Sequence, residues 1–335
     1  MTSSTRLYLT IDLERVGRQA GDAMLRWSDN SNPLGYHPIP VMSLKGGAGP
    51  VLLLVGGTHG DEFEGPAAIM RMLHAVDPSS LRGQIIAFPA LNMPAFAASS
   101  RVSPLDGANL NRAFPGDRDG GPTAMIAHFL ETEILPRCDA VLDLHSGGKA
   151  SFFQPCALPT RTGDPALAAK NMELAHLFGL PLVWRLGEHN DNRSVNAAAE
   201  RAGVPMIATE LGGGGGVDPG ITNQAEAGIW NILRHLGMVA GEVDHPPKPR
   251  VVEIRDPGAS LYATSEGLFD RALSAGQNVK TGDFAGWFHH VTEPERPSMR
   301  LTIPQDGMVL AHSNRGLVTR GEMLLLVAQD VDQAL

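Results

Sequence analysis

Two side chains that could bind a metal ion follow a short apolar stretch of the sequence. Residues 51–55 are uncharged and apolar, which predicts a fully buried strand, and His59 and Glu62 come shortly after it. Imidazole nitrogen and carboxylate oxygen are both common ligands of Zn²⁺ in proteins. Ligands and catalytic groups of open α/β sheets gather at the carboxyl ends of the strands. The pair therefore provides two ligands of a candidate zinc site.

A second apolar run supplies the third candidate ligand. Residues 140–145 predict a buried strand that ends in His145, and the small residues that follow leave the site open. Two imidazoles, one carboxylate and a water form a known type of catalytic zinc site, in which the metal lowers the pKa of the water to about 7. The alternative is a strand-end histidine that only hydrogen-bonds to the backbone. Because both motifs follow apolar strands, we favour zinc.

The end of a third predicted strand, residues 204–211, carries an acid that could act as a base. Glu210 stands where a buried strand would favour an apolar residue. Burial would raise the pKa of this carboxyl toward the range useful for a general base, whereas the charge of a metal would lower it. A surface glutamate at a strand end is the alternative. The five glycines that follow lack the Lys-Ser/Thr of a phosphate-binding loop, so they predict a turn.

A turn-rich loop at residues 100–116 adds cationic and amide side chains. These are Arg101, Asn109, Asn111 and Arg112. Arginine binds carboxylates through paired hydrogen bonds, and a fixed cation can stabilise an oxyanion. Surface charge is the alternative for each arginine. Because loops beside strand ends commonly carry function, we expect this loop to reach the candidate metal site.

These groups need an alternating arrangement of strands and helices to bring them together. Strand candidates are residues 51–55, 84–91, 140–145, 181–186 and 204–211, and helix candidates are residues 66–76, 122–135, 164–178, 194–202 and 222–237. Such alternation predicts an α/β fold with a mainly parallel sheet flanked by helices. Ahead of it, we expect a helical pattern over residues 16–27, a loop over residues 30–40 and an edge strand at residues 42–44.

The composition changes after about residue 240. Residues 241–249 are polar and rich in proline, which predicts a linker. The short apolar pieces beyond it are broken by Gly, Pro and Asn, which predicts an antiparallel β module. We therefore expect a catalytic α/β domain over residues 1–245 and a β-rich domain over residues 250–335.

Composition and charge exclude several classes of protein. The chain has 335 residues, 43% hydrophobic and 19% charged, as expected of a globular protein with one large domain or two. A net charge of −9 without a Lys/Arg-rich run argues against nucleic acid or an anionic membrane as partner. Cys138 and Cys156 imply no disulfide framework and fit a reducing compartment. Because no secretory signal or membrane span is evident, we expect a cytoplasmic location.

Four motifs together resemble the succinylglutamate desuccinylase/aspartoacylase family of zinc carboxypeptidase-like hydrolases. They are His59-Gly-Asp-Glu62, Asp143-Leu-His145, Asn111-Arg112 and Glu210. The resemblance implies one Zn²⁺ per chain, held by His59, Glu62 and His145, with Glu210 as general base and proton shuttle. It also implies that Arg101 polarises the scissile carbonyl.

By the same resemblance, Asn111 and Arg112 would bind the α-carboxylate of the substrate. The family's acid two residues before this pair is Asn109 here, and three extra residues separate Arg101 from the pair. This longer form is similar to the branch of Nα-acetyl-diaminobutyrate deacetylases of ectoine breakdown. The tail of the chain resembles a barrel-sandwich module of the biotinyl/lipoyl type, without the lysine that would carry a cofactor.

The resemblance implies a zinc amidohydrolase that removes a small acyl group from an N-acyl amino acid, with N-acetyl-diaminobutyrate as the leading substrate. The alternatives are another N-acyl amino acid, a peptide substrate as in metallocarboxypeptidases, or a non-catalytic binding protein that kept the fold. The sequence leaves the oligomeric state open, with a homo-oligomer as one alternative.

A diaminobutyrate-type substrate carries a side-chain ammonium, which needs a carboxylate partner. Glu188, Asp191 and Asp117 are candidates, and the sequence does not choose among them. Arg185 and Arg193 are candidates for a second contact to a carboxylate.

Overall fold

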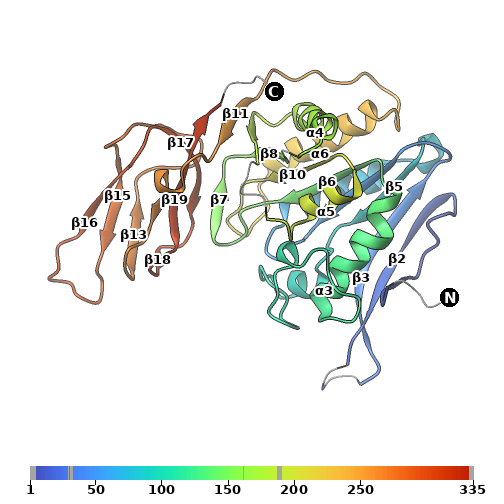
Figure 1. Cartoon of the computed structure of the whole chain (residues 1–335), viewed down its shortest axis with the longest axis horizontal. Coiled ribbons are helices and arrows are strands. Elements are labelled where there is room, and N and C mark those ends of the chain that lie inside the picture. The colour runs from blue at the N-terminus through green and yellow to red at the C-terminus, as the bar shows by residue number, and fades with distance from the viewer. Residues whose placement is uncertain (1–4, 29, 31–32, 161, 187–190, 332–335) are drawn as a thin grey trace.

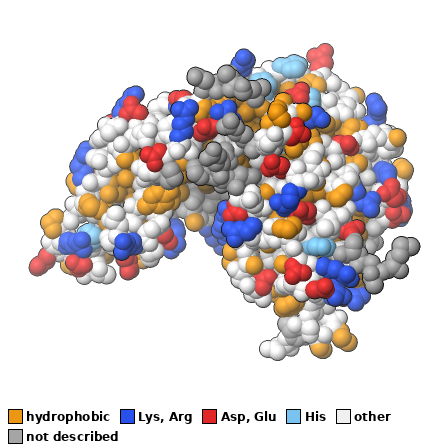
Figure 2. Space-filling view, in the orientation of Figure 1, with side chains coloured by type: hydrophobic (Ala, Val, Ile, Leu, Met, Phe, Trp, Pro, Cys, Tyr) orange, Lys and Arg blue, Asp and Glu red, His pale blue; other side chains and the backbone are white. Residues whose placement is uncertain are grey.

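The computed structural model describes residues 5–28, 30, 33–160, 162–186 and 191–331. A large mixed sheet runs through the molecule with helices on both faces, and a β-rich module lies beside one end of this sheet (Figure 1). The predicted α/β fold with a C-terminal β module is confirmed. Acidic and basic side chains are interspersed over the face shown in Figure 2.

Four neighbouring strands of the sheet run parallel and carry the candidate ligands to one edge. In spatial order they are β5 (Gln84–Phe88), β4 (Val51–Gly56), β6 (Ala140–His145) and β10 (Met206–Glu210). The register pairs Gly56 with Leu144, and His145 with Glu210. The carboxyl ends of β4, β6 and β10 therefore lie at one level.

The sheet continues on both sides of these four strands. Beyond β10 lie β8 (Cys156–Pro159), antiparallel to it, and then β9 (Leu182–Trp184) and β11 (Arg250–Glu253), each parallel to the strand before. Beyond β5 lie β3 (Tyr36–Lys45), β2 (Gly17–Arg26) and β1 (Tyr8–Leu9), all paired antiparallel.

Each face of the sheet has its own apolar core, because successive side chains of a strand point to opposite faces. Leu52 and Leu54 join one core, whereas Leu53 and Val55 join the other. The first core is covered by α1 (Glu64–Ala75), α4 (Pro165–Phe178) and α6 (Pro219–His235). The second is covered by α3 (Pro122–Phe129), the π-helical turn Leu130–Ile134, the 3₁₀ turn Leu135–Arg137 and α5 (Val195–Ala202).

The helical pattern expected over residues 16–27 is wrong, because this segment is strand β2. All ten of its residues pair with β3, and Ala23 and Leu25 enter the core. Pairing with the next strand along the chain thus overrides the local periodicity, as packing against neighbouring elements commonly does.

The loop expected over residues 30–40 and the edge strand expected at residues 42–44 also differ from the structure. Strand β3 begins at Tyr36, inside the expected loop, and its last four residues are interior, since they pair with both β2 and β5. Pro38 and Pro40 are tolerated in β3 because β5 pairs only with Met42–Lys45, which leaves the prolines with one neighbouring strand.

The C-terminal module consists of short strands around a third apolar core, which is built only from residues after 260. Its strands are β12 (Leu261–Tyr262), β13 (Gly267–Arg271), β14 (Asn278–Val279), β15 (Phe284–His289), β16 (Met299–Thr302), β17 (Gly307–Ser313), β18 (Leu317–Val318) and β19 (Met323–Asp330). Strand pairings join it to the larger sheet, since β11 pairs with both β9 and β19, and β7 (Ser151–Phe153) pairs with β17. The domain boundary between residues 245 and 250 stays a prediction.

No helix in the described part of the chain combines the length and the apolar character that a membrane span requires.

Candidate metal centre and active site

The structure brings His59, Glu62 and His145 together at the carboxyl edge of the parallel strands. One nitrogen or oxygen of each lies within 4.8 Å of those of the other two, and all three side chains are buried. The Glu62 carboxylate lies between the imidazoles, with Oε1 at 2.7 Å from His59 Nδ1 and Oε2 at 2.8 Å from His145 Nδ1. Two imidazoles and one carboxylate are the donor set of a catalytic zinc site. These residues can therefore hold a divalent metal.

The turn between β4 and α1 positions His59 and Glu62. Gly57 has a φ of +62°, which glycine adopts without a steric cost. A Cβ on Gly60 would lie 2.0 Å from the backbone of Ala95 in α2 (Met93–Ala97), so only glycine allows this close approach. The Gly60 N–H donates to Ser100 O at 2.9 Å. The same packing thus brings the loop that carries Arg101 to the candidate ligands.

Each imidazole is also held through its second nitrogen. Asp143 Oδ2 lies 2.9 Å from His145 Nε2, and the hydroxyl of Thr58 donates to Asp143 Oδ1 at 3.0 Å. Asn109 Oδ1 lies 3.1 Å from His59 Nε2. Such outer partners fix the orientation of metal-binding histidines. The orienting contact of Asp143 was missed from the sequence, although an acid two residues before His145 on the same strand face was a usable signal.

Neighbouring groups stabilise the buried charges of this cluster. Burial alone would raise the pKa of Glu62, but the imidazoles of His59 and His145 overcome this effect and hold it below its usual range. Burial opposes a proton on His145, yet the carboxylates of Asp143 and Glu62 raise its pKa well above the usual value. A divalent cation would supply the positive charge that this proton supplies here.

Glu210 lies beside the candidate ligands, and one of its carboxyl oxygens makes no hydrogen bond to the described residues. Its Oε2 is buried and has no hydrogen-bond partner among the described residues. Burial, and then the negative charge of Glu62, raise its pKa well above the usual value. A buried, unpartnered carboxyl oxygen is costly unless a ligand or water satisfies it. Glu210 therefore lies where it could accept and donate a proton.

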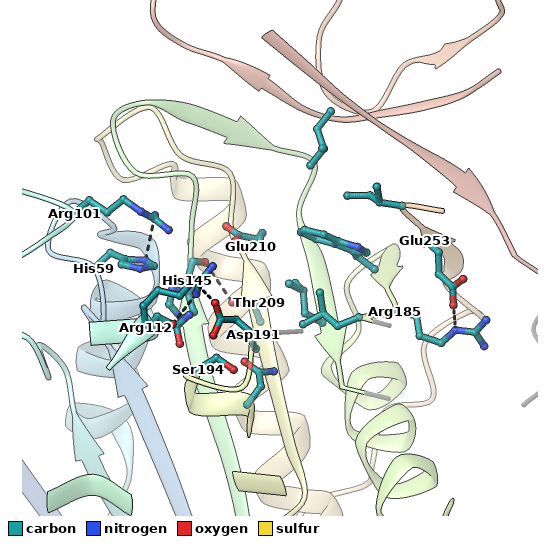
Figure 3. Close-up of a pocket in the computed structure, with 18 of the residues that line it drawn as sticks. His59, Arg101, Arg112, His145, Arg185, Asp191, Ser194, Thr209, Glu210 and Glu253 are labelled. Carbon is teal, nitrogen blue, oxygen red and sulfur yellow. Dashed lines mark hydrogen bonds and ion pairs between the residues drawn. The ribbon is translucent and has the colours of Figure 1, made fainter. Parts of the chain in front are cut away.

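Arg101 reaches the same place from its loop. Its Nη1 lies 3.3 Å from His59 Nδ1 and 3.4 Å from Glu62 Oε1, while about half of the side chain is exposed. Figure 3 shows Arg101 above His59, with its guanidinium directed into the cavity. The cation therefore lies where it could face a carbonyl oxygen near the metal-binding group.

Asn111 and Arg112 form part of the 3₁₀ turn Leu110–Arg112 at the cavity wall. Asn111 Oδ1 accepts from the N–H of Val195, the first residue of α5, at 3.0 Å. Arg112 donates to Asn111 O at 2.6 Å, and its Nε lies 3.1 Å from Asp191 Oδ2. The guanidinium is thus held on two sides and faces the cavity.

One cavity of about 530 Å³ connects these residues with the C-terminal module. We call the part lined by His59, Arg101, Arg112, His145 and Glu210 the metal end. We call the part lined by Trp184, Arg185, Glu253, Tyr262 and Leu326 the module end. Figure 3 shows Arg185 paired with Glu253, far from His145 across the cavity.

The remaining candidate residues lie in different parts of the structure. Arg185 pairs with Glu253 at the module end, and Arg193 pairs with Asp191. Asp191 lines the metal end beside Arg112, whereas Asp117 is exposed and does not line the cavity. Glu188 lies outside the described residues.

A mixed α/β sheet with two imidazoles, a carboxylate and an unpartnered glutamate at its strand ends defines a class of metal-dependent hydrolases that cleave amide bonds. The chain belongs to the succinylglutamate desuccinylase/aspartoacylase family, since residues 48–236 match the catalytic domain of that family. The predictions of the family and of a hydrolase acting on amide bonds are confirmed.

The relatives extend over nearly the whole chain. The N-alpha-acetyl-L-2,4-diaminobutyric acid deacetylase of Halomonas elongata is 35% identical over 325 residues, which cover 96% of this chain and 95% of that one. A succinylglutamate desuccinylase/aspartoacylase structure from Rhodobacter sphaeroides is 36% identical with a TM-score of 0.92 and covers 98% of this chain and 100% of its own. The product-bound ectoine utilization protein EutE (DoeB) of Ruegeria pomeroyi is 32% identical, with a TM-score of 0.93, over 97% and 99% of the two chains.

Proposed function

We propose that this protein is a zinc-dependent deacetylase of an N-acetyl amino acid of the 2,4-diaminobutyrate type. The observation that carries the proposal is the meeting of His59, Glu62 and His145 beside the unpartnered oxygen of Glu210. The deacetylase of Halomonas elongata and the ectoine utilization protein support the choice of substrate, because both match almost the full chain.

The donor set fits zinc. His59 Nδ1, His145 Nδ1 and the Glu62 carboxylate face one another, and their outer partners Asn109 and Asp143 fix the ring orientations. When bound, zinc polarises a carbonyl oxygen and makes its water acidic enough to yield hydroxide at neutral pH.

The protein groups around this centre have separate tasks. Arg112, with the amide of Asn111, binds the α-carboxylate and so places the amide bond at the metal end. Arg101 stabilises the negative charge that develops on the carbonyl oxygen. Glu210 takes a proton from the attacking water and then delivers it to the departing amine, a role that suits a buried carboxyl whose pKa is raised above its usual value.

The proposal extends to location and assembly. Both cysteines are buried free thiols, which suits the reducing cytoplasm that we propose. The substrate is a small molecule, and a homo-oligomer remains a proposal to be tested by the mass of the protein in solution.

The test combines metal analysis with a substrate panel. We expect about one zinc per chain and release of acetate from N-acetyl-2,4-diaminobutyrate. The same panel should contain N-succinylglutamate, N-acetylaspartate and short peptides, which separate the other family activities and a carboxypeptidase. A zinc-loaded protein that hydrolyses none of these amides would contradict the proposal, and faster cleavage of N-succinylglutamate would move the protein to the desuccinylases.

A further inference from the structure

We propose that Asp191 binds the side-chain ammonium of the substrate and so makes the enzyme selective for cationic amino acids. The inference rests on the proposed function, since the ammonium belongs to the diaminobutyrate-type product. It adds a residue that recognises the substrate side chain, next to the residues that bind the substrate carboxylate.

Asp191 is fixed in the wall of the metal end by two arginines. Arg193 donates to both carboxylate oxygens, from Nε at 3.0 Å and from Nη2 at 2.8 Å. Arg112, which also lines the cavity, has its Nε 3.1 Å from Asp191 Oδ2. About a quarter of the Asp191 side chain is exposed, and Figure 3 shows it beside Arg112 on the side of the cavity that holds His145. The carboxylate is therefore both held in place and open to a ligand.

The spacing of charges in the substrate matches this arrangement. In 2,4-diaminobutyrate, four covalent bonds of about 1.5 Å each separate the carboxyl carbon from the side-chain nitrogen, which places them at most ~5 Å apart. A carboxylate bound to Arg112 therefore leaves the ammonium within reach of an acid that contacts the same guanidinium. Substrate binding then gives two contacts between opposite charges, Arg112 with the carboxylate and Asp191 with the ammonium.

The other acids of the cavity do not meet this requirement. Among the described lining residues, the further carboxylates are Glu210 and Glu253. Glu210 serves the proposed proton transfer. Glu253 is on β11, four strands away from β6 in the sheet. Adjacent strands lie about 4.8 Å apart, so the two strands are separated by ~19 Å.

The length of the substrate excludes this distant acid. An N-acetyl amino acid is about as long as an extended dipeptide, at most ~7 Å. A substrate whose amide lies at the metal end thus ends well before Glu253.

The experiment compares two substrates of equal shape and different charge. N-acetyl-2,4-diaminobutyrate carries the ammonium, and N-acetylnorvaline has a methyl group in its place. The wild-type enzyme should favour the cationic substrate in kcat/KM. In Asp191→Asn this preference should fall by about 10- to 100-fold, the effect of losing one hydrogen bond to a charged group. Most of the loss should appear as a raised KM, with zinc content unchanged.

Glu253→Gln is the matched control, because it removes an acid of the same cavity at the module end. It should keep the preference for the cationic substrate. An equal loss on both substrates in Asp191→Asn would overturn the proposal, because it would show that Asp191 only positions Arg112. A loss of preference in Glu253→Gln but not in Asp191→Asn would overturn it as well.

A binding measurement separates this inference from the proposed function. If the wild-type protein hydrolyses neither substrate, the proposed deacetylase activity fails. Calorimetry with 2,4-diaminobutyrate and norvaline still tests Asp191 in that case. We expect the zinc-loaded wild type to bind diaminobutyrate more tightly than norvaline, and Asp191→Asn to bind both alike. Equal binding of the two by the wild type would contradict the assignment.

Discussion

The two ends of the cavity are built differently. At the metal end, His59, Glu62 and His145 are almost fully buried, and each is held by at least two hydrogen-bonded or charged partners. At the module end, the ion pair of Arg185 and Glu253 is only partly buried. The metal end comes from the parallel strand ends of one sheet, whereas the module end combines β9, β11 and the C-terminal module.

This difference decides how each end responds to change. Removing one partner from a buried charged group leaves the other charges uncompensated, which costs several kcal/mol. Water compensates a partly exposed ion pair, whose removal costs about 0–1 kcal/mol. We therefore expect large, specific effects at the metal end and small ones at the module end.

The largest effect is expected for Glu210→Gln. The amide cannot take up the proton of the attacking water, so kcat should fall by about 10²- to 10⁴-fold. Zinc should stay bound, because Glu210 is not among the candidate ligands. Turnover and zinc content are measured on the same sample, with His145→Ala as the comparison variant that should lose both. Substantial activity in Glu210→Gln would assign the proton transfer to another group.

A smaller effect is expected for Asp143→Asn. The amide keeps the shape of the side chain but removes the charge that faces His145 Nε2. Changes to such outer partners typically lower metal affinity or activity by about 10- to 100-fold. Competition with a chelator measures the zinc affinity. Asn109→Ala provides the matched change at His59, and if neither variant alters the affinity, these contacts do not orient the ligands.

The module end should tolerate the loss of its charges. We expect Glu253→Gln to change kcat/KM for the N-acetyl amino acid by less than about threefold, because its ion pair with Arg185 is partly exposed and lies beyond the substrate. Steady-state kinetics measure this directly. A loss as large as that of Asp143→Asn would mean that the whole cavity acts as one site.

The convergence of the candidate ligands at one edge of the sheet can be predicted from the sequence because its signals are local. Apolar runs define strands β4, β6 and β10, and their last residues or the turn after them carry His59, His145 and Glu210. Parallel strands bring such ends to one edge of the sheet without further information. Only the existence of each strand has to be recognised.

Contacts that have no local signal in the sequence could not be predicted in this way. Strand β2 has a helix-like pattern, and its pairing with β3 decides its conformation. Asp191 meets Arg112 across 79 positions of the sequence through loops without a repeating pattern. The sequence therefore offers Asp191 as one of three equal candidates, and its contact with Arg112 is visible only in the structure.

The smallest effect is expected where β7 pairs with β17 of the C-terminal module, and this effect depends on pH. His312 of β17 stacks on Phe152 of β7 with ring centroids 5.4 Å apart, and its Nδ1 accepts from the N–H of Ala275 at 3.0 Å. Burial, and then the cation of Arg271, lower the pKa of His312 to about 4. The folded state thus disfavours the protonated form of His312. The stability that the neutral imidazole provides is complete above the unfolded pKa of about 6.5 and is lost as the pH falls toward 4.

Replacing this imidazole should flatten the pH dependence of stability. His312→Gln cannot be protonated, so between pH 7 and pH 5 its melting temperature should fall less than that of the wild type. We expect a difference of about 1 kcal/mol, or ~1–2 °C for a chain of this size. Metal-free protein is used for both, because zinc binding has a pH dependence of its own. Parallel curves for the two proteins would show that the contact between β7 and β17 is insensitive to this proton, and that acid acts on the metal end instead.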